Sequence, residues 1–198
     1  ITMISNKNNC YKIVLLGESS TGKTSISVRF SKNEYYEYSE STIGAAFLTG
    51  KILINDEEHK FEIWDTAGQE RYNSLAPMYY HGAKAAIVVF DITNISSFNR
   101  AKRWITELHQ SSSKNIVIVL TGNKCDLEKK REISKEEAIE YADENNIYYV
   151  ETSAKENINI EKLFKIVGSK IPKNIEKDED NINIYAERST LVKKKNCC

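Results

Sequence analysis

A short segment near the N-terminus has the residue types and spacing that could hold a chain of phosphates. It reads Gly17-Glu18-Ser19-Ser20-Thr21-Gly22-Lys23-Thr24 and matches the pattern G-x-x-x-x-G-K-[ST]. The glycines let the backbone turn so that several N–H groups point at phosphate oxygens, and a helix starting here would add its positive end. Lys23 would reach the β- and γ-phosphates, and the Thr24 hydroxyl could ligate Mg²⁺. The segment therefore predicts a nucleoside triphosphate site without specifying the base, with phosphate contacts at Ser19, Ser20, Thr21, Gly22, Lys23, Thr24 and Ser25.

Two later segments could read the base. Asn123-Lys124-Cys125-Asp126 follows a predicted strand at 116–120, at the end of the strand where α/β sheets bind ligands. The Asp126 carboxylate could accept two hydrogen bonds from guanine, whereas adenine would leave it unpaired at a cost. Asn123 is predicted to tie the base site together, and the Lys124 stem to cover one face of the ring. The second segment, Ser153-Ala154-Lys155, could offer backbone N–H groups to guanine O6.

A third constellation could sense the γ-phosphate. Asp65-Thr66-Ala67-Gly68-Gln69 follows a predicted strand at 60–64. The Asp65 carboxylate could hold Mg²⁺ through a water, and the Gly68 N–H has room to bond a γ-phosphate oxygen. Gln69 is positioned to orient an attacking water, which makes it the predicted catalytic residue.

Two residues in the aperiodic stretch 31–44 would complete the site. Thr42 is the natural second protein ligand to Mg²⁺, so the predicted metal ligands are Thr24, Thr42 and Asp65. Tyr35 could cover the exposed guanine face. Loss of the γ-phosphate would remove the contacts of Thr42 and Gly68, and both of their segments would then loosen, which is the behaviour of a switch.

The elements that must position these residues alternate between β-rich runs and amphipathic stretches. Strands are predicted at 11–16, 46–54, 60–64, 85–90, 116–120 and 147–150, and helices at 24–30, 97–110, after Ser134 and at 160–171. The second and third strands are expected to pair as an antiparallel hairpin around a turn at 55–58. Ser134 and Glu137 form a capping box. The alternation predicts an α/β sheet with helices on both faces.

Composition bounds the remaining possibilities. The chain has 198 residues, is 40% hydrophobic, and balances 28 basic against 28 acidic side chains. Such a chain suits one domain with a sizeable core, and its zero net charge argues against nucleic-acid binding. Three scattered histidines, expected at the surface, show no ligand spacing: His59, His81 and His109. We expect a disordered N-terminal segment at 1–9, a nucleotide-binding domain at 10–171 and a flexible tail at 172–198.

Taken together and in this order, these motifs resemble those of Ras-superfamily GTPases over about residues 11–171. Residues 64–72 read WDTAGQERY and residues 79–83 read YYHGA, which are similar to Rab GTPases. Residues 42–47 read TIGAAF and residues 74–78 read SLAPM, which are similar to the early-endosomal, endocytic Rabs. Ser20 and Thr21 depart from the small apolar pair expected in that subgroup, and His81 stands where an arginine is more usual.

The resemblance implies a three-layer P-loop GTPase fold with a six-stranded, mostly parallel sheet and five helices. It implies slow hydrolysis of GTP to GDP with Mg²⁺ as cofactor, in a monomer. The implied partners are a GTPase-activating protein, an exchange factor, a GDP-dissociation inhibitor or escort protein, and effectors that read Phe47, Trp64 and Tyr79. Ordinary core packing is the alternative for these three aromatic residues.

The chain ends in Cys197-Cys198, which resembles the double-cysteine ending of Rabs that carries two geranylgeranyl groups. Two lipid chains would anchor durably where one would be marginal, and the basic run at 193–195 would add attraction to an anionic leaflet. The expected location is the cytoplasmic face of endosomal membranes, with a soluble cytosolic pool.

Three other interpretations remain open at this level. A P-loop kinase would prefer ATP and would have no use for the segments at 123–126 and 153–155. A scaffold that binds nucleotide without hydrolysing it is disfavoured by the presence of Thr24, Thr42 and Gln69. A Rab of another compartment would share all of the motifs. No loop arginine obviously enters the site, although Arg71 lies close to Gln69 in the sequence.

Overall fold

The computed structural model of the chain describes residues 9–111 and 116–172. Predictions for the segment 1–8 and for the tail from 173 onwards, including the lipidation of Cys197 and Cys198, lie outside these residues. No helix within the described ranges combines the length and hydropathy needed to cross a bilayer.

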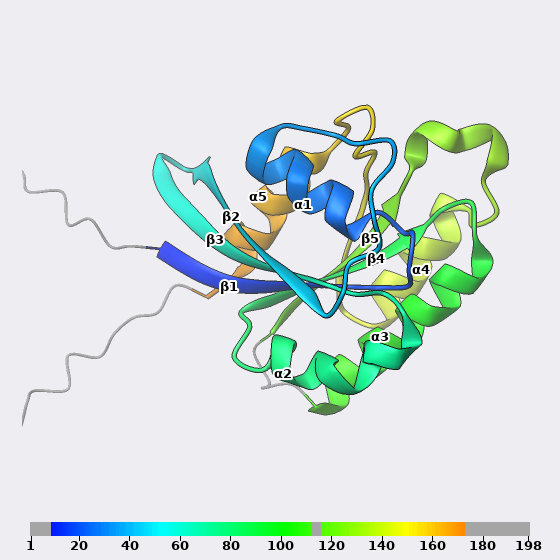
Figure 1. The fold of residues 1–198 in the computed structure, drawn as a ribbon, viewed down its shortest axis with the longest axis horizontal. Coiled ribbons are helices and arrows are strands. Elements are labelled where there is room, and N and C mark those ends of the chain that lie inside the picture. Colours follow the sequence, from blue (N-terminus) through cyan, green and yellow to red (C-terminus); the bar gives the residue numbers. More distant parts are fainter. Residues whose placement is uncertain (1–8, 112–115, 173–198) are drawn as a thin grey trace, which may run out of the picture.

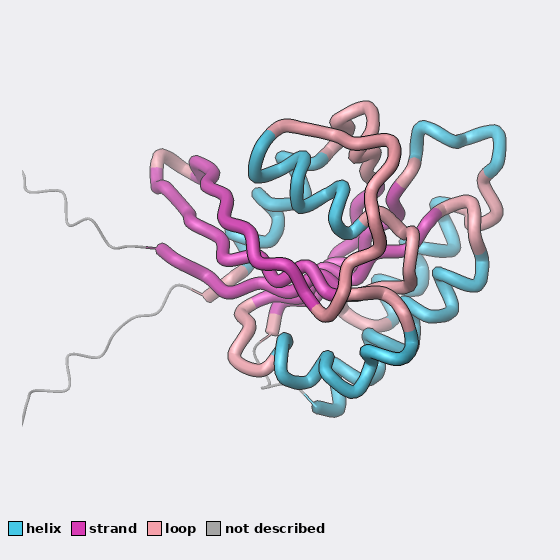
Figure 2. Tube along the Cα trace, in the orientation of Figure 1, coloured by secondary structure: helices cyan, strands magenta, loops and turns pink. Residues whose placement is uncertain are grey.

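Strands and helices alternate along the chain as the sequence predicts (Figures 1 and 2). The strands are β1 Asn9–Leu16, β2 Ala45–Ile54, β3 Glu57–Thr66, β4 Ala85–Asp91, β5 Val117–Asn123 and β6 Tyr148–Glu151. The α-helices are α1 Lys23–Lys32, α2 Ala76–Tyr80, α3 Ile95–Ser111, α4 Lys135–Glu144 and α5 Ile160–Lys170. Two 3-10 helices are added, η1 Glu70–Leu75 and η2 Cys125–Lys130.

The six strands form one sheet in the order β2-β3-β1-β4-β5-β6. Every neighbouring pair is parallel except β2 and β3, which form the expected antiparallel hairpin. The hairpin turn is shorter than predicted, because only Asn55 and Asp56 separate the two strands. Both residues have positive φ, as a two-residue turn of this kind requires. The predicted fold class, a six-stranded mostly parallel sheet flanked by helices, is confirmed.

Alternating side chains divide the core into two layers. On β1, Ile13 and Leu15 face a cluster that also contains apolar residues of α1 and α5. Val14 and Leu16 face the opposite cluster, which includes apolar residues of α2, α3 and α4. This period of two is what a strand buried on both faces requires. The carboxyl ends of β1, β3, β4 and β5 are thereby fixed side by side, which brings the loops after them to one edge of the sheet.

Some local predictions change. His59 is buried beneath α5, with 3% of its surface exposed, whereas the sequence predicted it at the surface. Gly168 leaves room for the imidazole against α5, and the Tyr11 ring packs against it. Asn123 is the last residue of β5 rather than the first loop residue. The helix predicted at 97–110 begins earlier, at Ile95, because the Asn94 side chain accepts from the N–H groups of Ser96 and Ser97. Ser134 caps α4 as predicted, accepting from the Glu137 N–H.

Candidate functional site

The predicted phosphate loop connects β1 to α1 and wraps around the side chain of Lys23. The Lys23 ammonium donates to the carbonyl oxygens of Gly17 and Glu18, at 3.0 and 2.8 Å. Burial of this side chain, which is 5% exposed, lowers the pKa of Lys23 to about 8. The loop therefore holds a cation under a turned backbone, an arrangement that a polyphosphate would complement.

Gly22 gives the loop its shape. Its φ of +94° is left-handed, and an added Cβ would lie 2.2 Å from the Asn123 side-chain nitrogen. Asn123 uses that nitrogen to donate to the Thr21 carbonyl oxygen at 2.9 Å. Only a residue without a Cβ lets the phosphate loop and the end of β5 approach this closely.

A cavity of about 740 Å³ opens above this loop. It is lined by nearly all of the residues that the sequence predicts to bind nucleotide: Ser19, Ser20, Gly22, Lys23, Thr24, Ser25, Tyr35, Thr42, Gly68, Asn123, Lys124, Asp126, Ala154 and Lys155. Gln69 also lines it. The structure thus brings together residues from distant parts of the chain, as the strand order requires. Residues 36–41, Thr66 and Leu127 line the cavity too, and the sequence motifs did not single them out.

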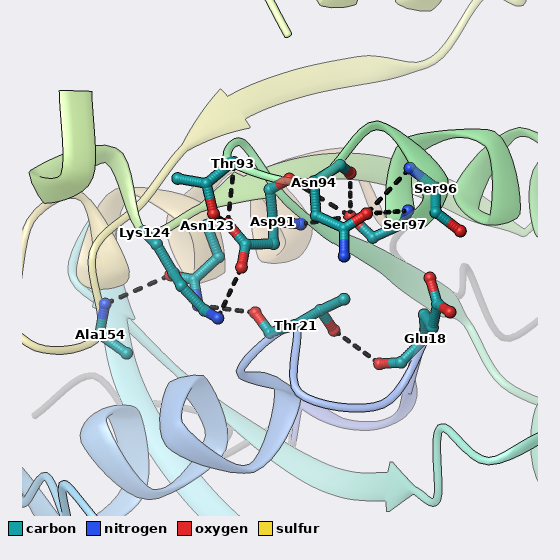
Figure 3. Close-up of polar contacts among 10 residues, drawn as sticks. All are labelled: Glu18, Thr21, Asp91, Thr93, Asn94, Ser96, Ser97, Asn123, Lys124 and Ala154. Atoms are coloured by element: carbon teal, nitrogen blue, oxygen red, sulfur yellow. Dashed lines mark hydrogen bonds and ion pairs between the residues drawn. The ribbon is translucent and has the colours of Figure 1, made fainter. Parts of the chain in front are cut away.

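Two predicted residues lie behind the cavity wall instead of lining it. Thr21 is 1% exposed, and its hydroxyl donates to the Glu18 carbonyl oxygen at 3.0 Å (Figure 3). Ser153 is fully buried, and its N–H donates to the Ile158 carbonyl oxygen. Both therefore shape their loops. Of the two hydroxyls that depart from the expected subgroup pattern, only that of Ser20 belongs to a residue lining the cavity.

The predicted metal ligands converge. The Thr24 hydroxyl donates to Asp65 Oδ2 at 2.6 Å, and its oxygen lies 3.0 Å from the Thr42 hydroxyl oxygen. Asp65 is fully buried, and its other carboxylate oxygen, Oδ1, has no hydrogen-bond partner. Burial raises the pKa of Asp65, while the Thr24 hydrogen bond and nearby Lys23 oppose the rise.

This oxygen set fits Mg²⁺, which prefers carboxylate and hydroxyl oxygens and usually keeps several waters. A buried carboxylate oxygen without a partner is what a cation or its water would satisfy. Thr24, Thr42 and Asp65 would hold the ion, which would supply positive charge across the β- and γ-phosphates.

The ends of β4 and β5 and the loop after β6 meet next to the phosphate loop, at the place predicted for the base (Figure 3). Asn123 Oδ1 accepts from the Thr152 hydroxyl at 3.1 Å and from the Ala154 N–H at 3.3 Å. Asn123 therefore ties the second base segment to the phosphate loop, the role that the sequence predicted for it. Lys124 adopts a positive φ of 67°, and its ammonium lies 2.6 Å from Asp91 Oδ2. Asp91, the last residue of β4, was missed, because a lone aspartate at a strand end carries no motif.

Gly68 brings the third constellation against the phosphate loop. A Cβ at this position would lie 2.4 Å from the Ser19 backbone nitrogen and 2.6 Å from the Glu18 carbonyl oxygen. The sequence predicted a glycine here so that its N–H could approach a phosphate. The crowding is consistent with this prediction, because a side chain at this position would clash with the phosphate loop. Gln69 follows, and its side-chain oxygen accepts from Arg71 Nε at 2.7 Å.

The predicted effector residues form a contiguous aromatic row contributed by β2, β3 and α2. Phe47 packs edge-on against Trp64, with ring centroids 5.5 Å apart, and Trp64 lies 5.7 Å from Tyr79. Phe47 is 54% exposed, while Trp64 and Tyr79 pack partly against the core. Core packing and surface display are therefore combined in one row, which we call the aromatic row.

A family model described as Ras family matches residues 12–173. The chain belongs to the Ras family. Proteins of this family are small GTPases, which bind guanine nucleotides, typically with Mg²⁺, and hydrolyse GTP. They generally interact with activating proteins, exchange factors and effectors. The match spans the phosphate loop and the segments 65–69, 123–126 and 153–155, so the chain has the domain of a small GTPase switch.

Proposed function

We propose that this small GTPase is a Rab that regulates endocytic vesicle traffic and membrane fusion from the cytoplasmic face of endosomes. The observation that carries the proposal is the aromatic row. Phe47 and Trp64 lie on β2 and β3, the two strands whose ends border Gly44 and Gly68. An aromatic surface at this place suits an interface, and it adjoins the two segments that would respond to the γ-phosphate.

Two adjacent cysteines and a nearby run of lysines support a proposal of membrane attachment. Cys197 and Cys198 are proposed to carry two geranylgeranyl groups, with the lysines at 193–195 adding attraction to an anionic leaflet. A GDP-dissociation inhibitor or escort protein would then shield the lipids of a cytosolic pool.

The anchor is tested by changing both cysteines to serine in a fluorescently tagged chain. The double variant is expected in the soluble fraction after cell lysis, whereas the parent chain is expected with membranes. Cys10→Ser is the matched control, because this cysteine is exposed on β1 and far from the end of the chain. Persistence of the double variant on membranes would contradict lipid anchoring.

The endocytic assignment is tested with the GTP-locked variant Gln69→Leu. Tagged protein should coincide with vesicles that contain a briefly internalised fluid tracer, and should enlarge them if it promotes fusion. Accumulation on a compartment that the tracer does not reach would replace the endosomal assignment with another Rab compartment.

Effector binding is tested by capture on immobilised protein loaded with a GTP analogue or with GDP. Proteins held only by the GTP form are the expected effectors. Phe47→Ala should release them without loss of nucleotide, since this side chain is half exposed and does not line the cavity. Retention of every GTP-dependent partner by Phe47→Ala would contradict the assigned role of the aromatic row.

A further inference from the structure

Arg29, in the last turns of α1, makes three hydrogen bonds to backbone carbonyl oxygens in two separate loops. Its Nε donates to Ala154 at 2.9 Å and its Nη2 to Lys155 at 3.1 Å. Its Nη1 donates to Asn33 at 2.9 Å, just beyond the end of the helix. The guanidinium also lies 5.9 Å from the ring centroid of Tyr35, within the range of a cation–π contact. One side chain therefore touches both the second base segment and the start of the loop that leads to Thr42.

The two loops make two further contacts with each other. The Asn157 side chain donates to the Asn33 side chain at 3.3 Å, and Lys155 lies 3.8 Å from Glu37. These outer contacts are exposed, so each contributes little by itself. The Arg29 contact with Ala154 is partly buried. Figure 1 shows the loop after α1 running beside the loop that precedes α5.

The contacts of Arg29 extend a chain of fixed groups that starts in the phosphate loop. Asn123 binds the Thr21 carbonyl and accepts from the Ala154 N–H. Arg29 then binds the carbonyl oxygen of the same Ala154. Both the N–H and the carbonyl group of Ala154 are therefore hydrogen-bonded. The arginine that binds the carbonyl also contacts Asn33 and Tyr35. Tyr35, Ala154 and Lys155 all line the nucleotide cavity.

We propose that Arg29 is a positioning residue that holds the base segment and residues 33–37 together over the guanine, and thereby sets how long the nucleotide stays bound. The inference rests on the proposed function, in which the cavity binds a guanine nucleotide. Arg29 lies outside the set of residues that line the cavity, so it acts through Tyr35, Ala154 and Lys155. A planar guanidinium suits this role because it can bind three carbonyls from one fixed fork, which a lysine cannot.

The test compares dissociation of fluorescently labelled GDP from wild-type protein and from Arg29→Ala, with Mg²⁺ present and excess unlabelled GDP. The variant is expected to release GDP about tenfold faster, the loss expected for one charge-assisted hydrogen bond that no longer holds the bound state. Arg29→Lys is expected to be intermediate. Single-turnover hydrolysis of preloaded GTP should stay within about twofold of wild type, because the arginine holds the base end of the site.

Arg103→Ala is the matched control, since Arg103 is an exposed arginine on the helix α3. It should leave the dissociation rate unchanged. Equal dissociation rates in wild type and Arg29→Ala would overturn the inference, as would slowed hydrolysis with normal dissociation. If Arg29→Ala does not fold, the GDP dissociation rate is measured in Arg29→Lys instead. A wild-type dissociation rate in Arg29→Lys would then overturn the inference. Failure of the wild-type protein to retain GDP would instead contradict the nucleotide site itself.

Discussion

At the scale of single residues, base selection is predicted to depend on one carboxylate, that of Asp126. Asp126 lines the cavity together with Asn123 and Lys124, which are held in place by Thr21 and by Asp91. Asp126→Ala would remove two hydrogen bonds to guanine, so we expect GTP affinity to fall by about 100-fold or more. Displacement of a labelled nucleotide measures this.

Glu136→Ala, at an exposed position on α4, is the control for a lost acidic side chain. Affinity for ATP is expected to be weak in the wild type and unchanged in Asp126→Ala. A variant that keeps wild-type GTP affinity would show that the carboxylate does not read the base.

Hydrolysis is predicted to depend on a different residue, Gln69. Gln69 lines the cavity, and its side-chain oxygen is occupied by Arg71. We expect the amide to turn from Arg71 towards the γ-phosphate when it orients a water. We expect Gln69→Leu to slow single-turnover hydrolysis by at least about tenfold while sparing GTP binding. Arg71→Ala should retain hydrolysis nearer the wild-type rate, and a reversal of these two results would move the catalytic role to Arg71.

The residues of the site differ in how far the sequence could predict them. Gly22, Lys23 and Thr24 fall within a contiguous motif, and the chemistry of that motif fixes their places. Asp91 and Arg29 have no such signal, because their partners lie far along the chain and, for Arg29, are backbone carbonyls that any residue type provides. The burial of His59 was not predicted, because a polar side chain on a strand gives no sign that a helix will pack over it. Here α5 does so at Gly168, which leaves room for the imidazole.

At the scale of elements, the sequence predicted the long strands and helices, since their periodicity extends over many residues. It missed η1, α2 and η2, which have at most six residues each and are shaped by the loops around them. η2 matters for the site because it contains Asp126. Its position relative to β6, which leads to the second base segment, therefore affects the site.

Arg131 connects η2 to β6. Its guanidinium donates to both carboxylate oxygens of Glu151, at 2.8 and 3.1 Å, and to Glu128. Tyr149 donates to the same Glu151 at 2.9 Å. Burial is the main cause that raises the pKa of Tyr149, so its hydroxyl stays protonated and able to donate.

Arg131→Met should therefore leave Glu151, whose side chain is 14% exposed, without its cation. We expect the free energy of unfolding to fall by about 2–3 kcal/mol, at or just below the range for breaking a fully buried pair, because both side chains keep some exposure. Denaturant unfolding at a fixed, saturating GDP concentration measures the change. Lys165→Met is the control, because the Lys165–Glu161 pair is exposed and should contribute less than about 1 kcal/mol. Equal losses in the two variants would show that the Arg131 network does not hold η2 to β6.

At the scale of the whole molecule, the sheet is a rigid base and two segments are suited to move. β4 is buried along its whole length between the two layers of helices. The segment 33–44, by contrast, contains no strand or helix and displays large side chains, with Tyr38 at 93% and Ile43 at 81% exposure. Few buried apolar contacts hold such a segment, so its order depends on what it binds.

The γ-phosphate is expected to supply that order through Thr42 and Gly68. Amide hydrogen exchange in residues 35–44 and 68–75 should therefore be at least about tenfold slower with a non-hydrolysable GTP analogue than with GDP. Exchange in β4 should be the same in both forms. Thr42→Ala separates the two segments: it should abolish the difference in 35–44 and preserve most of that in 68–75, because Gly68 still packs against the phosphate loop at Ser19. Identical exchange in both nucleotide states would mean that the third phosphate does not order these loops, and effector capture would then have to depend on something other than the switch.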